Sequence, residues 1–332
     1  MSEMFESSRA IPVPVTILTG FLGAGKTTLL NRILSENHGL RIAVIENEFG
    51  EAGIDNDLLF NEREQIVEMN NGCICCTVRG DLVRILGNLS AQREDGLIYF
   101  DRVVIETTGL ADPAPVAQTF FVEPDIGEYY RLDAIITVVD AKHAPGQLDE
   151  HHEAQEQVGF ADRLLLSKTD LVSDAERQQL EARLRTINAR APIAAAHFGE
   201  ADISEILDIH GFSLNAILEI EPEFLQDVSH EHDDDIRSFV FRTDKAFDAA
   251  RIIAFMDVMV REYGVDLLRY KGIINIAGTD RKIIYQGVHM LLADHIGIPW
   301  PANQPRQSVL VFIGRNLPET EIKAALDSCL VR

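Results

Sequence analysis

The sequence contains few basic residues, few cysteines and no long apolar run. Its 332 residues carry 30 Lys and Arg against 53 Asp and Glu, which gives a formal net charge of −23. So acidic a chain offers no basic stripe to a nucleic-acid backbone and is repelled by an anionic membrane surface. No apolar run approaches the roughly 20 residues of a membrane-spanning helix, and residues 1–10 lack the apolar centre of a signal peptide. We expect a cytoplasmic protein that binds neither nucleic acid nor membrane.

The length of the chain indicates two domains, because single hydrophobic cores stop growing near about 250 to 300 residues. Alternating strand and helix patterns over 1–225 predict an α/β domain whose mostly parallel sheet is covered by helices on both faces. Residues 236–332 predict a smaller α+β domain, an antiparallel sheet with helices on one face. An acidic linker at 226–235 joins the two. Its His230 and His232 fit a solvated spacer as well as a metal-loading site.

The most informative motif runs from Gly20 to Thr28 and fits Gly-x4-Gly-Lys-Thr. An apolar strand pattern at 13–19 precedes it and a helical stripe at 28–35 follows it. This is the order of a phosphate-binding loop, whose backbone N–H groups converge on phosphate at a helix N-terminus. Lys26 would reach the outer phosphates and the Thr27 hydroxyl would ligate Mg²⁺. The motif predicts a P-loop NTPase fold with nucleotide contacts from Gly20, Gly23, Ala24, Gly25, Lys26, Thr27 and Thr28.

Three of the four cysteines, Cys73, Cys75 and Cys76, lie together. Disulfides within such a cluster would be strained, and a cytoplasmic chain does not favour them. Clustered thiolates instead suit a soft metal such as Zn²⁺ or Cu(I). Free cysteine also fills cores, but the turn signal at 70–72 places this cluster at a loop tip. We predict a metal site here and assign Cys329, on the last predicted helix, to the core.

Acidic residues end two of the predicted strands. The strand at 41–46 ends in Glu46, with Glu48 and Glu51 just beyond it, and open α/β folds bind ligands at this edge. A solvated acidic loop would give the same pattern in so acidic a chain. The strand at 103–106 ends in Glu106, which can hold Mg²⁺ through water. Gly109, three residues later, can donate its N–H to a terminal phosphate.

A further strand at 163–166 runs into Ser167-Lys168-Thr169-Asp170. A carboxylate such as that of Asp170 can accept both the ring N–H and the exocyclic amine of guanine, a pair that adenine cannot supply. The tetrapeptide alone is weak evidence. Downstream of a phosphate loop and a Glu-x-x-Gly element, it indicates a guanine nucleotide.

The second half of the chain carries a helical pattern at 249–263 and a closing helix at 318–330. Strands are predicted at 237–242, 272–277, 282–288 and 308–313. Isolated His289 and His295 are expected to be structural. The helix at 249–263 is expected to bury Ile252, Ile253, Met256, Met259, Val260 and Tyr263.

Five motifs together resemble the CobW/YjiA family of phosphate-loop GTPases, which act as metallochaperones. They are Gly-Phe-Leu-Gly-Ala-Gly-Lys-Thr-Thr-Leu-Leu, Ile-Glu-Asn-Glu-Phe-Gly-Glu, Asn-Gly-Cys-Ile-Cys-Cys, Glu-Thr-Thr-Gly-Leu-Ala-Asp-Pro and Ser-Lys-Thr-Asp. The likeness continues through 269–272, 286–288 and 311–314, so it covers nearly the whole chain. It implies slow GTP hydrolysis coupled to metal insertion, with zinc as the favoured cargo and cobalt delivery for cobalamin as a variant.

The resemblance implies roles for the residues that match its motifs. Lys26, Thr27 and Glu106 would act in catalysis, and Lys168 with Asp170 would bind guanine. The transported metal would be bound by Glu46, Glu51, Cys73, Cys75 and Cys76. One position departs from the family, because Ser167 stands where the guanine motif usually begins with Asn. We expect this change to remove the side-chain amide that braces the phosphate loop, and so to weaken nucleotide binding.

We therefore predict a GTP-hydrolysing metallochaperone that uses GTP or GDP, Mg²⁺ and Zn²⁺, or cobalt or another transition metal, and that delivers the metal to a client protein. Two other classes fit part of the pattern. The phosphate loop alone permits a small-molecule kinase, and a metal sensor or store could hold nucleotide without useful turnover. The cysteine cluster and the guanine motif argue against the kinase. The sequence identifies neither the client, nor the physiological metal, nor the choice between monomer and homo-oligomer.

Overall fold

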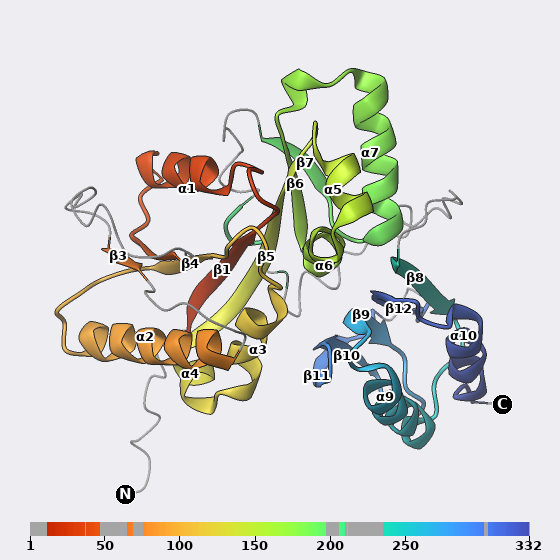
Figure 1. Ribbon diagram of the computed structural model, residues 1–332. Coiled ribbons are helices and arrows are strands. Elements are labelled where there is room, and N and C mark those ends of the chain that lie inside the picture. Colours follow the sequence, from red (N-terminus) through yellow and green to blue (C-terminus); the bar gives the residue numbers. More distant parts are fainter. Residues whose placement is uncertain are drawn as a thin grey trace, which may run out of the picture.

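The computed structural model describes residues 12–36, 38–46, 65–68, 76–196, 206–209, 211, 235–301 and 305–331. Figure 1 shows two sheets, each with its own helices. Seven parallel strands form the larger sheet, where the sequence predicted a mostly parallel one. Their order across the sheet is β3 (Gln65–Glu68), β2 (Ile42–Glu46), β4 (Arg102–Glu106), β1 (Val13–Thr19), β5 (Tyr130–Asp140), β6 (Arg163–Ser167) and β7 (Ile193–Ala196).

Helices cover both faces of this sheet, because its strands send apolar side chains alternately to either side. Ile17 and Ile105 belong to the core with α2 (Cys76–Glu94), α3 (Ala114–Val122), α6 (His152–Phe160) and α7 (Asp174–Ile187). Their neighbours Leu18 and Val104 belong to the core with α1 (Lys26–Ser35) on the other face. Among the described residues, the remaining helical elements of this domain are α4 (Pro124–Tyr129), α5 (Ala144–Glu150) and a 3-10 turn, η1 (Thr169–Leu171).

The C-terminal sheet is antiparallel, as predicted. Its strand order is β11 (Leu291–Pro299), β10 (Arg281–Val288), β9 (Leu267–Ile274), β12 (Ser308–Arg315) and β8 (Ile236–Thr243). Helices α9 (Ala249–Tyr263) and α10 (Glu319–Ser328) pack with it through a core that includes Met256, Phe312 and Leu326.

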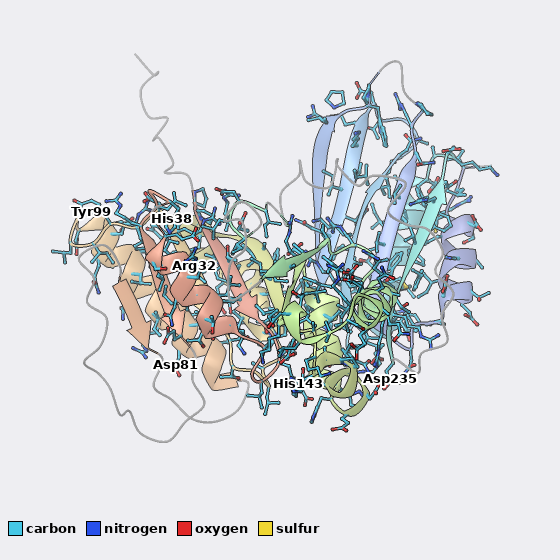
Figure 2. The ribbon with its side chains drawn as sticks, turned by 90° about the horizontal axis from the view of Figure 1, so that it is seen from above. Arg32, His38, Asp81, Tyr99, His143 and Asp235 are labelled. Atoms are coloured by element: carbon cyan, nitrogen blue, oxygen red, sulfur yellow. The ribbon has the colours of Figure 1, made fainter. Side chains whose placement is uncertain are left out.

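The other face of the C-terminal sheet packs against the N-terminal domain. Leu268 and Ile313 share one buried cluster with Phe160 of α6. In Figures 1 and 2, α6 and α7 lie between the two sheets. Arg269 of β9 forms a buried ion pair with Asp162 and donates from Nη1 to the Phe160 carbonyl oxygen at 2.6 Å. The two domains therefore share part of one core.

Three of the strands predicted for the C-terminal domain are confirmed as β8, β10 and β12, whereas the one predicted at 272–277 lies at 267–274 and β11 was not predicted. The helix predicted at 249–263 is α9, and Cys329 is buried in the core beside it. Ile253 was wrongly assigned to the core, because it lies on the outer side of α9 and is 53% exposed. His289 packs on the Phe160 ring at 5.2 Å between ring centroids, a structural contact.

None of the described helices has both the length and the apolar character needed to cross a membrane.

Candidate functional site

The phosphate-loop motif lies at the carboxyl end of β1, in the middle of the large sheet. The turn requires glycine. Gly20 has φ of 142°, and a Cβ on it would lie 2.3 Å from the Val138 carbonyl oxygen. Gly25, with φ of 101°, is the N-cap residue of α1, and no described side chain caps this helix. Its first N–H groups can therefore bind an anion.

Lys26, the first residue of α1, folds back over the loop. Its Nζ donates to the Gly20 carbonyl oxygen at 2.8 Å, and its side chain is buried. Burial lowers the pKa of the ammonium group, and the nearby Glu106 carboxylate partly opposes this shift. A cation at the start of α1 and a carboxylate at the end of β4 thus lie near each other, beside the loop that is predicted to bind phosphates.

Thr27 and Glu106 meet at the ends of two neighbouring strands. Thr27 Oγ1 donates to Glu106 Oε1 at 2.9 Å. Glu106 is the last residue of β4 and lies opposite Leu18 of β1. Hydroxyl and carboxylate oxygens are hard ligands, the kind that Mg²⁺ prefers. The two residues predicted to hold magnesium therefore suit that ion. Thr28 follows them in the first turn of α1 and is exposed.

The loop after β4 returns to the phosphate loop. Thr107 Oγ1 donates to Thr19 Oγ1 at 2.8 Å. A Cβ on Gly109 would lie 2.6 Å from the Leu22 backbone nitrogen, so only glycine permits this approach. The segment predicted to contact a terminal phosphate therefore lies against the segment predicted to hold the other phosphates.

The predicted guanine motif also reaches the phosphate loop. Ser167 Oγ donates to the Ala24 carbonyl oxygen at 2.6 Å. Serine has no side-chain amide, but its shorter hydroxyl still contacts the phosphate loop from the end of β6. The weaker nucleotide binding expected from the loss of the amide stays a prediction. Lys168 Nζ donates to the Gly23 carbonyl oxygen at 2.8 Å. Asp170 follows in η1 and is exposed, as a base-recognising carboxylate would have to be.

Sequence reasoning missed Asp140, the last residue of β5. Its buried carboxylate accepts from Lys168 Nζ at 2.6 Å and lies 2.8 Å from Nδ1 of His143, which is labelled in Figure 2. Burial raises the pKa of Asp140, but the contacts with Lys168 and His143 outweigh it and hold the pKa below its ordinary value of 3.8. An acid that ends a long apolar strand was the signal available in the sequence.

The predicted metal ligands are described only in part. Glu46 is the last residue of β2 and lies opposite Glu106 of β4. Cys76 begins α2, but its side chain is not among those described. Within the described ranges, no three His, Cys, Asp or Glu side chains form a group that could hold a metal ion. The predicted residues outside those ranges are Glu48, Glu51, Cys73, Cys75, His230 and His232.

Two known protein families match this chain, one over each domain. Residues 14–195 match the family described as CobW/HypB/UreG, nucleotide-binding domain, and residues 236–330 match the cobalamin synthesis protein cobW C-terminal domain. The chain belongs to the CobW family. The family and the fold predicted from the sequence are confirmed.

Similar proteins cover nearly the full chain. The zinc chaperone YjiA of Escherichia coli is 44% identical over 95% of this chain and 98% of its own length. The zinc-regulated GTPase metalloprotein activator 1 of Dictyostelium discoideum is 30% identical over 96% of this chain and 80% of its own. The crystal structure of the Zn(II)-bound YjiA GTPase from E. coli matches with a TM-score of 0.79 and 38% identity, over 97% of this chain and 100% of that one.

Proposed function

We propose that this chain is a cytoplasmic, GTP-hydrolysing metallochaperone that binds Zn²⁺ and transfers it to a metal-requiring client protein. The observation that carries the hydrolase part is the hydrogen bond of 2.9 Å that joins Thr27, in the first turn of α1 after the glycine loop, to Glu106 at the end of β4. The zinc part is supported by the cysteine motif and by the names of similar proteins from E. coli and D. discoideum.

In this proposal, different residues bind the phosphates, the magnesium ion and the guanine base. The N–H groups of the loop from Gly23 onward and the Lys26 ammonium bind the phosphates. Thr27, with Glu106 acting through water, holds Mg²⁺, which neutralises charge on the phosphate oxygens. Gly109 donates its N–H to the terminal phosphate. Asp170 accepts from the guanine ring, while Lys168 holds Gly23 in place.

The zinc ligands proposed here are Glu46, Glu51, Cys73, Cys75 and Cys76. Thiolates and carboxylates are both zinc ligands. Glu46 and Glu106 occupy the same level of adjacent strands, so one edge of the sheet would serve both the metal and the nucleotide. Replacement of GDP by GTP at Glu106 and Gly109 would then change the surroundings of Glu46. This proximity supports a nucleotide-controlled metal site.

The test is zinc affinity, measured by competition with a chromogenic chelator in GDP and in a non-hydrolysable GTP analogue. The two affinities should differ by about 5 to 150-fold, the usual range of a real coupling between sites.

Cys75→Ala should remove tight zinc binding and leave GTP binding near normal. Lys26→Ala should abolish phosphate release, because its Nζ lies in the phosphate loop, while the variant stays folded. Equal zinc affinity in both nucleotides would leave a metal store and contradict the chaperone proposal.

A further inference from the structure

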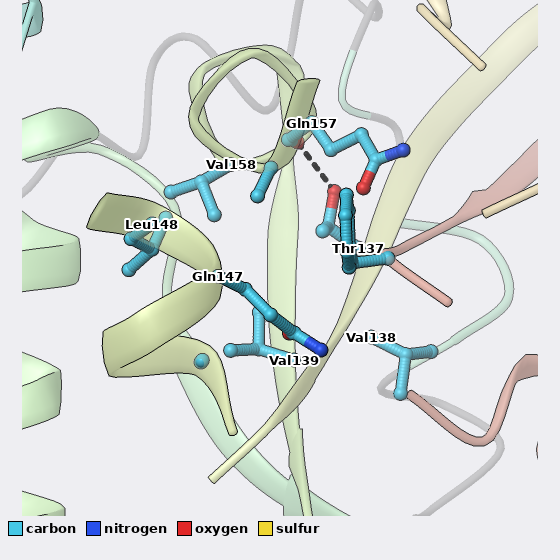
Figure 3. A pocket seen from close by; sticks show the side chains of 10 residues that line it. Thr137, Val138, Val139, Gln147, Leu148, Gln157 and Val158 are labelled. Atoms are coloured by element: carbon cyan, nitrogen blue, oxygen red, sulfur yellow. Dashed lines mark hydrogen bonds between the residues drawn. The ribbon is translucent and has the colours of Figure 1, made fainter. Parts of the chain in front are cut away.

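A buried glutamine connects α6 to the loop that follows β4. Gln157 is 1% exposed, and its Nε2 donates to the carbonyl oxygens of Gly109 and Ala111, each at 3.1 Å. Two oxygens face the amide at this point, so its NH₂ end must point at the loop. Figure 3 shows the side chain extending from α6 past Thr137 of β5.

The backbone of Gln157 is bonded to the central sheet. Its backbone carbonyl oxygen accepts from Thr137 Oγ1 at 2.6 Å, the bond drawn in Figure 3. Two residues earlier, Gln155 Nε2 donates to the Leu148 carbonyl oxygen at 2.8 Å, and its Oε1 accepts from Ile236 N at 3.3 Å. Helix α6 is thus attached both to the central sheet and to the C-terminal domain. The bond from Thr137, made at Gln157 itself, gives the loop a fixed point of attachment.

The oxygen of the Gln157 amide indicates that this side chain does more than fill space in the core. Gln157 Oε1 is buried and has no hydrogen-bond partner among the described residues, and Gln157 lines a small cavity together with apolar residues such as Phe21 and Leu148. An unsatisfied buried acceptor is unfavourable. A methionine of similar size would fill this space without that cost. What only the amide supplies is the pair of donors to the loop.

We propose that Gln157 is a positioning residue for GTP hydrolysis. Its two N–H groups hold the turn from Gly109 to Ala111, so that the Gly109 N–H is directed at the terminal phosphate. This inference rests on the proposed function, since it takes the nucleotide to be GTP and Gly109 to be its contact. GDP has no phosphate at that place. Gln157 should therefore affect binding of the triphosphate and leave binding of the diphosphate unchanged.

The experiment measures affinity for fluorescent GDP and for a fluorescent non-hydrolysable GTP analogue, together with kcat and KM for GTP, in the full chain. Gln157→Met keeps the size of the side chain and removes both donors. We expect analogue affinity to fall by about five to tenfold, the effect of losing hydrogen bonds to a buried loop, with GDP affinity within about twofold of wild type. The kcat for GTP should fall with it.

The matched control is Gln155→Met, a buried glutamine on the same helix that does not touch the loop. It should leave the affinity for both nucleotides unchanged. If Gln157→Met does not fold, Gln157→Asn retains the amide but draws it out of reach of the loop, and the same result is expected. Equal analogue affinity in wild type and variant, or an equal loss for GDP, would overturn the inference alone. A wild-type protein that neither binds the analogue nor hydrolyses GTP would overturn the proposed function and this inference with it.

Discussion

At position 167 a single hydroxyl holds the phosphate loop from the end of β6. Ser167→Ala removes its bond of 2.6 Å to the Ala24 carbonyl oxygen. A hydrogen bond of this kind contributes about 1 kcal/mol, so affinity for GDP and for GTP should each fall about fivefold. Nucleotide titration checks this. Ser173→Ala is the control, because Ser173 caps α7 and its loss should lower stability by about 1 kcal/mol without changing nucleotide affinity. Unchanged affinity in Ser167→Ala would show that the brace does not matter.

Asp140 should make the stability of the protein depend on pH. Its folded-state pKa lies below the ordinary 3.8, so its ionised form stabilises the folded protein above about pH 4. That contribution is lost as pH falls through the folded-state pKa. Asp140→Asn should lower the free energy of unfolding by about 1 to 3 kcal/mol at pH 7, the value of hydrogen bonds to a charged group, and by less at pH 3. Urea unfolding at both pH values tests this, and an equal difference at the two would contradict it.

Two helical glycines should respond to substitution in opposite directions. A Cβ on Gly159 of α6 would lie 3.1 Å from Leu268 Cδ2 in the C-terminal sheet, whereas one on Gly87 of α2 meets no atom within 4 Å. Gly159→Leu should destabilise the protein by about 1 to 3 kcal/mol through overpacking. Gly87→Ala should stabilise it by about 0.5 to 1 kcal/mol, because alanine is the better helix former. Thermal unfolding of both variants distinguishes the signs. If Gly159→Leu unfolds at the same temperature as the wild type, the packing of α6 against the C-terminal sheet is not tight enough to exclude a larger side chain at this position.

Elements beside a strong motif were predictable from sequence, and isolated short ones were not. β1 and α1 flank the glycine loop, so their order and period could be recognised. β7 has only four residues, three of them alanine, and carries no strand pattern of its own. β9 was placed from Gly272, yet it begins at Leu267, because Arg269 and Lys271 look like surface residues. Both are buried against the N-terminal domain, a contact that no local pattern contains.

The candidate site shows the same limit. The residues predicted to bind phosphate through their backbone N–H groups, from Gly20 to Thr28, follow a fixed spacing and could be found by it. Asp140 and Gln157 act on the site from β5 and α6, at distances along the chain set by the fold alone. The hydroxyl contact of Ser167 with Ala24 was not predicted, because it depends on how β6 lies beside β5.

At the scale of the whole molecule, each domain alone would expose apolar side chains that the other domain covers. Leu268, Val311 and Ile313 are buried in one cluster with Val158 and Phe160 of α6. A chain that ends at residue 235 should therefore have a lower melting temperature and should aggregate. The control is the full chain cut at a protease site inserted within 226–234, whose halves should stay together on gel filtration. If the truncated chain melts like the full one, the shared cluster contributes little to stability.

The shared cluster also matters while the chain is being made. Domains generally fold as units while the chain is still being synthesised, and synthesis adds about 5 to 20 residues per second. The N-terminal domain is synthesised first, but its partner residues extend as far as Ile313. Synthesis from residue 235 to Ile313 takes roughly 4 to 16 seconds, and during that time the apolar face on α6 lacks some of the residues that cover it in the folded protein. A ribosome that stalls between β8 and β12 would leave that face open to general folding chaperones or to aggregation.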